Sequence, residues 1–422
     1  MKKIIVVHHT LPNLAGWTTI LINNVIPILR KKMEIELVWV IHSNIDISEY
    51  KCDKNERIIK MNCYTNAFEV LEKEKPDLIY IIPGLNAPDY AFSIAAKSLN
   101  IFRIGSEIAN LLFTKRNKMG TLTQVKNNRK DVSSQLQNFF TNNKFLINTQ
   151  RKAGWNHFKI FLDLCSMFFM YFPIKGYGSR PEYSPKFELD LHFIESELTL
   201  KTVTDLGFQK SRIMITGNPS YDEVFQLLKT SKKNNTQKNK KKILIVTALL
   251  YGQSQNKALS QRKFFIQEVT KAIPKDEFEV VIKIHPVQEN LDDYTNMLGT
   301  TNSSVSIIQN ANLSELVLNA DIIITPVSGT AVITAFVARK PIIIWNVFNV
   351  QNDVLLNNKL ALECKDEKMI LKQIRKAETW LPAEEKTEQF IREFLYSADG
   401  KASERIADGI LSVLKNQDAD LP

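Results

Sequence analysis

Cysteine is scarce in this chain of 422 residues, and its four cysteines are scattered at positions 52, 63, 165 and 364. So few cysteines cannot stabilise a chain of this length through disulfide bonds, and their spacing fits neither a zinc knuckle nor a redox pair. The sequence therefore argues against a disulfide-built secreted protein and predicts a cytoplasmic location.

Long hydrophobic runs are also missing. The most apolar stretch, residues 155–173, is interrupted by Asp163, and its continuous part is shorter than the ~20 residues that a membrane-spanning helix needs. Two interpretations remain open for this stretch. It is either a helix packed in the protein, or an interfacial helix that contacts the inner membrane surface, as its basic neighbours Arg151, Lys152 and Lys159 suggest.

Acidic residues are outnumbered by basic ones, 45 against 55, which gives a formal net charge of +10. Much of the excess lies in one polar run, residues 229–242, which contains seven lysines and no aliphatic or aromatic residue. Such a run cannot bury surface. It predicts a solvated linker between two domains, and no nucleic-acid partner is expected.

Short apolar runs and helical periodicity alternate on both sides of this linker. In the first half, strands are expected at 4–7, 35–41, 76–82, 101–104 and 191–194, with helices at 18–30, 66–74 and 91–99. In the second half, strands are expected at 242–247, 279–284, 305–308, 321–325 and 340–345, with helices at 260–273, 313–318 and 330–338. This alternation predicts an α/β protein with two Rossmann-like, doubly wound domains facing a cleft.

Two of these strands end in residues suited to bind a nucleotide. His285 and Pro286 follow one strand, and Lys283 lies two residues before His285 on the same side of that strand. Ser328, Gly329 and Thr330 stand between the next buried strand and a helix, where backbone N–H groups and the helix dipole favour a phosphate. An ordinary helix cap formed by Ser328 or Thr330 is the alternative interpretation.

The order of the motifs resembles the GT-B glycosyltransferase superfamily. The motifs are Thr-Gly-Asn-Pro-Ser-Tyr-Asp at 216–222, Lys-Ile-His-Pro at 283–286, and Ala-Asp-Ile-Ile-Ile-Thr-Pro-Val-Ser-Gly-Thr-Ala at 320–331, followed by Lys-Pro-Ile-Ile at 340–343. Within the superfamily the chain is similar to the branch of UDP-N-acetylglucosamine 2-epimerases, CDP-glycerol glycerophosphotransferases, and capsule and sialyltransferases. The resemblance covers about residues 189–346, while the N-terminal half agrees only in its βαβ rhythm.

The resemblance implies four parts. Residues 1–228 form an acceptor-side domain, 229–242 the linker, 243–383 the donor-binding domain, and 384–422 helices that cross back to the first domain. It also implies that His285 lies at the nucleotide donor, and that Gly217, in a left-handed turn, and Asn218 line the cleft. Thr334 stands where many relatives carry a ribose-binding Glu, so it offers only a weaker ribose contact.

The catalytic base is expected after a strand of the first domain, where Glu107 is the first choice and His9 the second. The loop after the strand at 76–82 offers Gly84, Leu85 and Asn86 in place of the Asp expected of an epimerase. This departure counts against proton abstraction at a sugar carbon.

The expected function is therefore a metal-independent, inverting transferase of cell-surface polysaccharide or glycoconjugate synthesis, with no cofactor. Its donor is a nucleotide-sugar or nucleotide-glycerol of the CMP/CDP or UDP type, and its acceptor is a glycan or a lipid-linked precursor. A UDP-sugar 2-epimerase or hydrolase is the first alternative. A degenerate GT-B scaffold that binds a partner without catalysis is the second.

Overall fold

The computed structural model describes residues 1–8, 11–12, 20–42, 47–48, 50–81, 87–106, 132–171, 189–205, 207–230, 240–247, 255–285, 289–298, 305–326, 329–348 and 353–419. The chain divides into two compact units. Unit 1 comprises Met1–Ile108, Lys130–Pro219 and Lys401–Pro422, and unit 2 includes Ser220–Gly400.

Unit 1 is built on a seven-stranded sheet in the order β3-β2-β1-β4-β5-β6-β7, in which all neighbouring strands are parallel. Its strands are β1 (Lys2–His8), β2 (Ile35–Ile41), β3 (Glu56–Lys60), β4 (Leu78–Tyr80), β5 (Phe102–Ser106), β6 (Leu191–Ile194) and β7 (Ile213–Ile215). Continuous apolar runs such as Ile4–Val7 fit a parallel strand that is buried on both faces.

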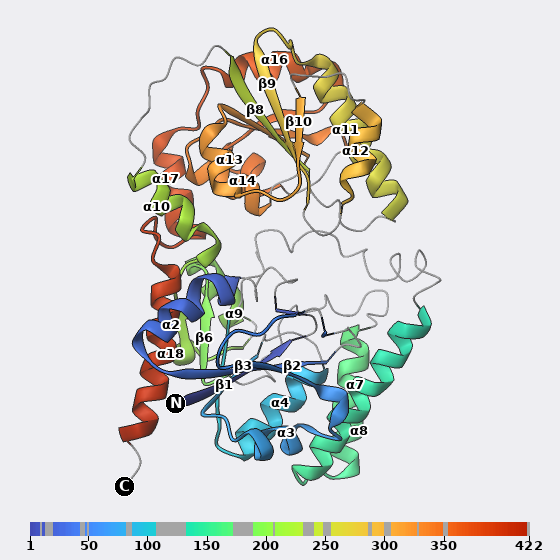
Figure 1. Ribbon diagram of the computed structural model, residues 1–422, viewed down its shortest axis with the longest axis vertical. Coiled ribbons are helices and arrows are strands. Elements are labelled where there is room, and N and C mark those ends of the chain that lie inside the picture. Colours follow the sequence, from blue (N-terminus) through green and yellow to red (C-terminus); the bar gives the residue numbers. More distant parts are fainter. Residues whose placement is uncertain are drawn as a thin grey trace. The chain divides into compact units, whose positions relative to one another are not determined.

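Helices cover both faces of this sheet (Figure 1). One face is covered by α3 (Ala67–Glu74), α4 (Ala87–Ser98) and α7 (Val132–Lys152), and the other by the π-helix η1 (Leu21–Val25), α2 (Ile26–Lys32) and α18 (Ala402–Ala419). The other helical elements in the described part of this unit are α8 (His157–Tyr171), α9 (Glu197–Asp205) and the 3-10 turns Met61–Cys63 and Lys210–Arg212. Alternate β1 residues enter the two cores, with Ile5 and Val7 in one and Ile4 and Val6 in the other.

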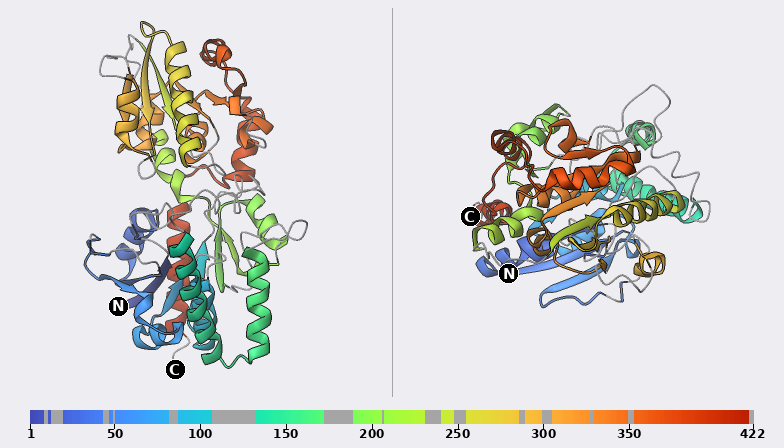
Figure 2. Two further views of the ribbon diagram at one scale, coloured as in Figure 1. Left: turned by 90° about the vertical axis from the view of Figure 1, so that its right-hand side faces the viewer. Right: turned by 90° about the horizontal axis from the view of Figure 1, so that it is seen from above.

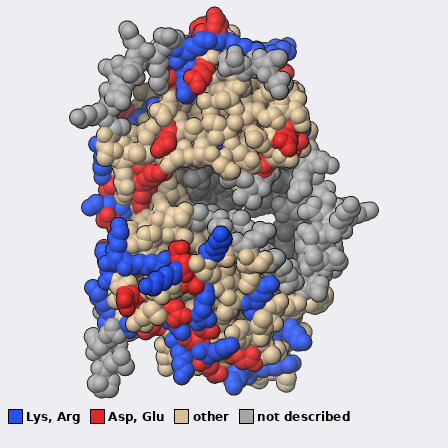
Figure 3. All heavy atoms as spheres, in the orientation of Figure 1, with Lys and Arg blue, Asp and Glu red and all other residues tan. Residues whose placement is uncertain are grey.

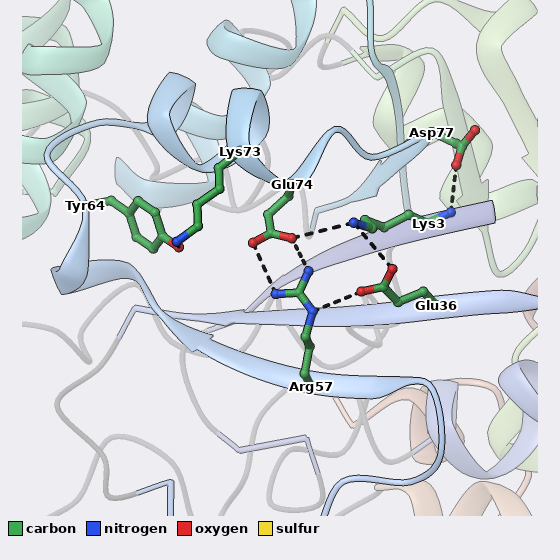
Figure 4. Close-up of polar contacts among 7 residues, drawn as sticks. All are labelled: Lys3, Glu36, Arg57, Tyr64, Lys73, Glu74 and Asp77. Atoms are coloured by element: carbon green, nitrogen blue, oxygen red, sulfur yellow. Dashed lines mark hydrogen bonds and ion pairs between the residues drawn. The ribbon is translucent and has the colours of Figure 1, made fainter. Parts of the chain in front are cut away.

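The amino ends of β1, β2 and β3 are joined by an ion-pair network (Figure 4). The Arg57 guanidinium binds both oxygens of the buried Glu74 carboxylate, and its Nε lies 2.9 Å from Glu36 Oε1. Lys3 Nζ lies 3.4 Å from Glu36 Oε2 and 3.8 Å from Glu74 Oε2. These charges lie at the edge of the sheet opposite the strand carboxyl ends, where ligands bind in such folds. The network is therefore structural.

Unit 2 has a six-stranded parallel sheet in the order β10-β9-β8-β11-β12-β13. Its strands are β8 (Lys241–Val246), β9 (Phe278–Lys283), β10 (Val305–Ile308), β11 (Ile322–Thr325), β12 (Ile342–Trp345) and β13 (Leu362–Cys364). Its helices are α10 (Asp222–Thr230), α11 (Gln255–Ala272), α12 (Leu291–Leu298), α13 (Leu313–Asn319), α14 (Thr330–Val337), α15 (Val354–Asn357), α16 (Ile370–Ala377) and α17 (Glu384–Phe394), with 3-10 turns at Pro219–Tyr221, Asn346–Phe348 and Glu367–Met369. One core gathers α10, α13, α14, α15 and α17, and the other gathers α11, α12 and α16.

Both sheets have the strand order of doubly wound nucleotide-binding domains, in which the chain starts at a central strand and winds outward in each direction. The predicted fold class, α/β with two Rossmann-like units, is confirmed. The division of the chain differs from the sequence boundaries at two helices, α10 and α17. Although residues up to 228 were assigned to the first domain, α10 belongs to unit 2 because Val224 and Phe225 pack in its core.

The last helix, α18, belongs to unit 1, whereas α17 belongs to unit 2. Ile406, Ile410 and Leu414 of α18 are buried against the sheet and α2. The chain therefore returns to its first unit after residue 400.

On the face drawn in Figure 3, lysine and arginine are interspersed with aspartate and glutamate over the described surface of unit 1. None of the described helices is long and apolar enough to span a bilayer.

Candidate functional site

The carboxyl edge of the unit 2 sheet brings together several predicted donor-site residues. The winding reverses between β8 and β11, and in open parallel sheets the crevice at such a reversal is where ligands bind. Thr247 directly follows β8, β11 ends at Thr325, and α14 begins a few residues further along the chain. Next to β8, strand β9 leads into His285.

Glu289 organises this edge, a role that its sequence context does not indicate. Its side chain is 1% exposed. One carboxylate oxygen accepts hydrogen bonds from the Thr247 hydroxyl and, at 2.5 Å, from the His285 backbone N–H. The other accepts from the Tyr294 hydroxyl and lies 3.0 Å from Arg262 Nε. A single buried carboxylate thus ties the end of β8 to the end of β9, and a buried guanidinium balances its charge.

His285 is held by its backbone at both ends. Its N–H donates to Glu289, and its carbonyl accepts from Gln309 Nε2 at 3.4 Å. Burial lowers the pKa of the His285 imidazole, and although Glu289 opposes this shift, Lys283 and Arg262 add to it. The ring is therefore neutral near pH 7. A neutral imidazole can donate one hydrogen bond and accept another, as recognition of a base, ribose or phosphate requires.

Lys283 lies beneath this edge and is 8% exposed. Its ammonium donates to the backbone carbonyls of Ile284, at 2.7 Å, and Gln309, at 2.8 Å. Burial lowers the pKa of Lys283, although the nearby Glu289 carboxylate opposes the shift. In this conformation Lys283 ties the end of β9 to the segment after β10.

The start of α14 has the geometry of an anion site. Gly329 is the N-cap residue in an extended conformation, with φ −163°, and it has no side chain with which to cap the helix. A Cβ built on Gly329 would meet nothing within 4 Å, so a ligand can approach the backbone closely. A cap formed by Ser328 or Thr330 is not tested, because Ser328 and the side chain of Thr330 lie outside the described part of the chain. The helix dipole adds attraction for a phosphate at this point.

Thr334, the predicted ribose contact, is 2% exposed on α14. It lies one turn inside the helix, and its carbonyl accepts from the Ala338 N–H at 2.9 Å. The structure therefore keeps its hydroxyl away from solvent.

In unit 1, Gly217 and Asn218 follow β7. Gly217 has φ +82°, which confirms the predicted left-handed turn. Asn218 is 5% exposed, and its side chain hydrogen-bonds Glu195, which follows the neighbouring strand β6. The other Glu195 oxygen, Oε1, has no hydrogen-bond partner among the described residues. Burial raises the pKa of Glu195 to about 7, with only the Asn218 hydrogen bond opposing it.

Four predicted site residues lie outside the described part of the chain: His9, Glu107, Pro286 and Ser328. For Thr330, the structure describes its place as the first residue of α14. Glu289, Arg262 and Glu195 are not predicted from sequence. The one sequence signal for Glu289 is its position four residues after His285. Nothing in the sequence of α11 distinguishes Arg262 from the other basic residues of that helix.

Metal ligands do not gather in the described residues, which contain no group of three or more His, Cys, Asp or Glu side chains able to hold an ion.

Comparison with solved structures defines the class of the fold. UDP-GlcNAc 2-epimerase from Neisseria meningitidis, solved with UDP-GlcNAc, is similar over 97% of this chain and 100% of its own, with a TM-score of 0.53 and 16% identity. The wall teichoic acid polymerase TagF is similar over 99% of this chain and 90% of its own, with a TM-score of 0.54 and 13% identity. UDP-GlcNAc 2-epimerase from Methanocaldococcus jannaschii is similar over 98% of this chain and 100% of its own, with a TM-score of 0.53 and 16% identity. The protein therefore has the GT-B fold.

A family model described as UDP-N-acetylglucosamine 2-epimerase matches residues 189–411, more than half of the chain. The protein belongs to this family and is thus an enzyme of the nucleotide-sugar-related GT-B type, as the sequence resemblance predicted. No curated protein matches it.

Proposed function

We propose that this protein binds a nucleotide-activated donor at the carboxyl edge of the unit 2 sheet and transfers its sugar or glycerophosphate to an acceptor hydroxyl. The donor is of the CMP/CDP or UDP type, and the acceptor is a glycan or a lipid-linked precursor of a cell-surface polymer. The observation that carries this proposal is the start of α14 at Gly329, an extended N-cap residue with open space where a side chain would stand.

The chemistry follows from the charge that develops on the donor. As the bond to the phosphate breaks, negative charge grows on the leaving nucleotide, and N–H groups fixed at a helix start stabilise it without reorganising. His285, held by Glu289, adds a hydrogen bond or a proton to the same phosphate. We expect this site to work without a metal, so EDTA should leave the transfer rate unchanged.

The acceptor hydroxyl must lose its proton as it attacks. We retain Glu107 as the proposed base for an inverting reaction, with His9 as the second choice. Glu195 has a pKa suited to proton transfer, but it is 3% exposed and so has no access to an acceptor in this conformation.

A UDP-sugar 2-epimerase or hydrolase is the second candidate, and the family match favours it. One sequence feature favours transfer instead, because the segment after β4 carries Gly84, Leu85 and Asn86 without the Asp expected of an epimerase. The replacement of the expected ribose-binding Glu by Ile333-Thr334-Ala335 motivates a third candidate, a scaffold that binds without catalysis. Tight nucleotide binding without turnover would point to the third candidate, a non-catalytic scaffold.

The deciding experiment incubates the purified protein with UDP-GlcNAc, CDP-glycerol and CMP-sialic acid, each with and without a glycolipid acceptor. If the protein is a transferase, nucleotide release should depend on the acceptor. His285→Ala should lower the rate of release at least tenfold, and the control His157→Ala, at an exposed position, should leave it unchanged. Release of UDP together with a 2-epimerised sugar, in the absence of acceptor, would overturn transfer in favour of epimerisation.

We also propose that the enzyme acts in the cytoplasm. All four cysteines are free thiols, as a reducing compartment requires.

A further inference from the structure

The first turns of helix α8 in unit 1 carry large apolar side chains that face outward. Phe158 is 70% exposed, Phe161 61% and Leu162 51%. Residues at positions i, i+3 and i+4 lie on one side of a helix, so these three side chains form a single apolar face. The packed-helix interpretation of residues 155–173 therefore fails for this face of α8.

The inward face of the same helix carries its acidic residue. Asp163 is buried and accepts hydrogen bonds from Gln150 Nε2, at 2.8 Å, and from the Tyr90 hydroxyl, at 3.4 Å. Ile160 is buried beside it on the helix. A helix made to face water shows the reverse pattern, with apolar residues inside and charge outside. The polar contacts of Asp163 fix α8 in the rotation that exposes the phenylalanines.

The charges that border this face are of one sign. Residues 132–162 contain Lys144, Arg151, Lys152 and Lys159 but no aspartate or glutamate. All four basic residues are exposed, and Lys159 Nζ lies 3.9 Å from the centre of the Trp155 ring. The helices α7 and α8 run antiparallel, joined by a short turn at residues 153–156 (Figure 2), so Arg151 and Lys152 lie close to the start of α8.

We infer that α8 docks on the surface of an anionic lipid bilayer. Phe158, Phe161 and Leu162 enter the boundary between headgroups and acyl chains, while Arg151, Lys152 and Lys159 contact the headgroup phosphates. An apolar helix face bordered by lysine and arginine is the pattern of membrane-surface helices, and anionic lipids attract each nearby basic residue. The contact is peripheral, since α8 has 15 residues and a span needs ~20.

A second copy of the chain fits this face less well. In a two-fold symmetric dimer the same patch meets itself, so the basic residues around α8 would face one another without any acidic side chain from residues 132–162 to balance them. A membrane supplies the opposite charge. The inference goes beyond the proposed transfer reaction and does not depend on it, because docking needs neither donor nor acceptor.

The test is flotation of the full chain with two kinds of vesicle, phosphatidylcholine alone and phosphatidylcholine mixed with phosphatidylglycerol. The wild type is expected to float with the mixed vesicles and to remain largely unbound with the neutral ones. The double variant Phe158→Ser/Phe161→Ser should lose at least tenfold in partitioning, because it removes two large apolar side chains from the boundary between headgroups and acyl chains. Leu381→Ser, which removes an apolar side chain that is 55% exposed in unit 2, is the matched control and should bind like the wild type.

A second variant, Lys152→Glu/Lys159→Glu, should abolish the preference for phosphatidylglycerol. Because all four substituted side chains are exposed, the variants should melt like the wild type, which separates lost docking from lost folding. The inference is overturned if the wild type floats with neither vesicle, if the phenylalanine variant floats as well as the wild type, or if that variant instead converts a dimer to a monomer in light scattering. Turnover of a soluble acceptor in the absence of flotation would contradict docking alone and leave the transfer proposal standing.

Discussion

Two buried glutamates show how surroundings decide what a carboxyl group does in this protein. Glu289 accepts hydrogen bonds from Thr247, Tyr294 and the His285 backbone, and Arg262 balances its charge. Glu195 is also buried, but its one described hydrogen bond is to Asn218, and no cation in the described part of the chain offsets its burial. The first is a charged structural hub, while the second keeps its proton up to neutral pH.

Glu195 should make the protein less stable as pH rises. Below pH 4.5 its carboxyl is neutral in both states, whereas between pH 4.5 and about 7 the unfolded chain loses a proton that the folded chain retains. The free energy of unfolding therefore falls by about 3 kcal/mol through this window, since each pKa unit corresponds to about 1.4 kcal/mol. Above the window it levels off. Glu195→Gln, whose amide is neutral at every pH, should remove this dependence.

Urea unfolding of the wild type and Glu195→Gln at several pH values between about 4.5 and 8 measures the effect. The difference between the two proteins should grow in favour of the variant as pH rises. Parallel curves would show that Glu195 is not a buried neutral acid.

Glu289→Gln should weaken both the fold and the donor site. The substitution leaves Arg262 buried without a counter-charge, and breaking a buried ion pair costs about 3–5 kcal/mol. It also loosens the segment that carries His285, so nucleotide affinity should fall together with stability. Calorimetric melting and nucleotide titration measure the two effects. Glu279→Gln is the control, since its exposed pair with Lys242 should contribute at most about 1 kcal/mol. Equal melting of the two variants would contradict the role of Glu289 as a hub.

At the scale of the elements, a substitution at the start of α14 can add a negative charge without lowering the stability of the fold. Gly329 has an extended φ and open space around its missing Cβ, so Gly329→Asp fits without strain. Aspartate is also a better N-cap than glycine by a few tenths of a kcal/mol. The variant should therefore fold at least as well as the wild type and bind nucleotide at least about tenfold more weakly, because its carboxylate repels the phosphate.

Gly329→Asn is the matched control, since it has nearly the same shape and capping ability without the charge. It should lose much less affinity than the aspartate variant in the same titration. If Asp and Asn variants bound nucleotide as well as the wild type, the phosphate would not lie at this helix start.

Helix α18 packs closely on unit 1 at Gly409. A Cβ at this position would lie 2.6 Å from a ring carbon of Phe193 and 3.2 Å from Met214 Sδ. Because Phe193 is fully buried, Gly409→Ala should destabilise the protein by about 1–2 kcal/mol, despite alanine's helix propensity. Ser412→Ala, at an exposed position on the same helix, should leave the melting temperature nearly unchanged. A Gly409→Ala variant as stable as the wild type would mean that α18 does not pack here as described.

The helices and strands could largely be predicted from hydrophobic pattern. The buried strands β1, β2, β8 and β11 are continuous apolar runs, and α3 begins at the capping residue Asn66, as expected. Strand β3 was missed because it is a half-buried edge strand whose few apolar residues give no clear alternation. The rotation of α8 could not be predicted either, because it depends on the contacts of Asp163 with Gln150 and Tyr90.

At the scale of the whole molecule, the strand order brings the predicted site residues together, which the sequence motifs alone do not show. The motifs predicted which strand ends matter, and the strand order of unit 2 brings β8, β9 and β11 to adjacent positions at one edge. The residues that set the electrostatics of this edge were not predictable, because Arg262 and Glu289 meet through tertiary packing. Local patterns do not carry information of that kind.

The central claim is that the carboxyl edge of the unit 2 sheet binds the nucleotide of an activated donor. Thermal unfolding of the wild type, His285→Ala and His157→Ala with UDP, CDP, CMP or GDP tests it most directly, since a ligand at a hundred times its Kd adds about 2.7 kcal/mol of stability. We predict that a pyrimidine nucleotide stabilises the wild type and the His157 variant, and that this stabilisation is lost in His285→Ala. Absence of stabilisation by every nucleotide, or an equal shift in His285→Ala, would contradict the account.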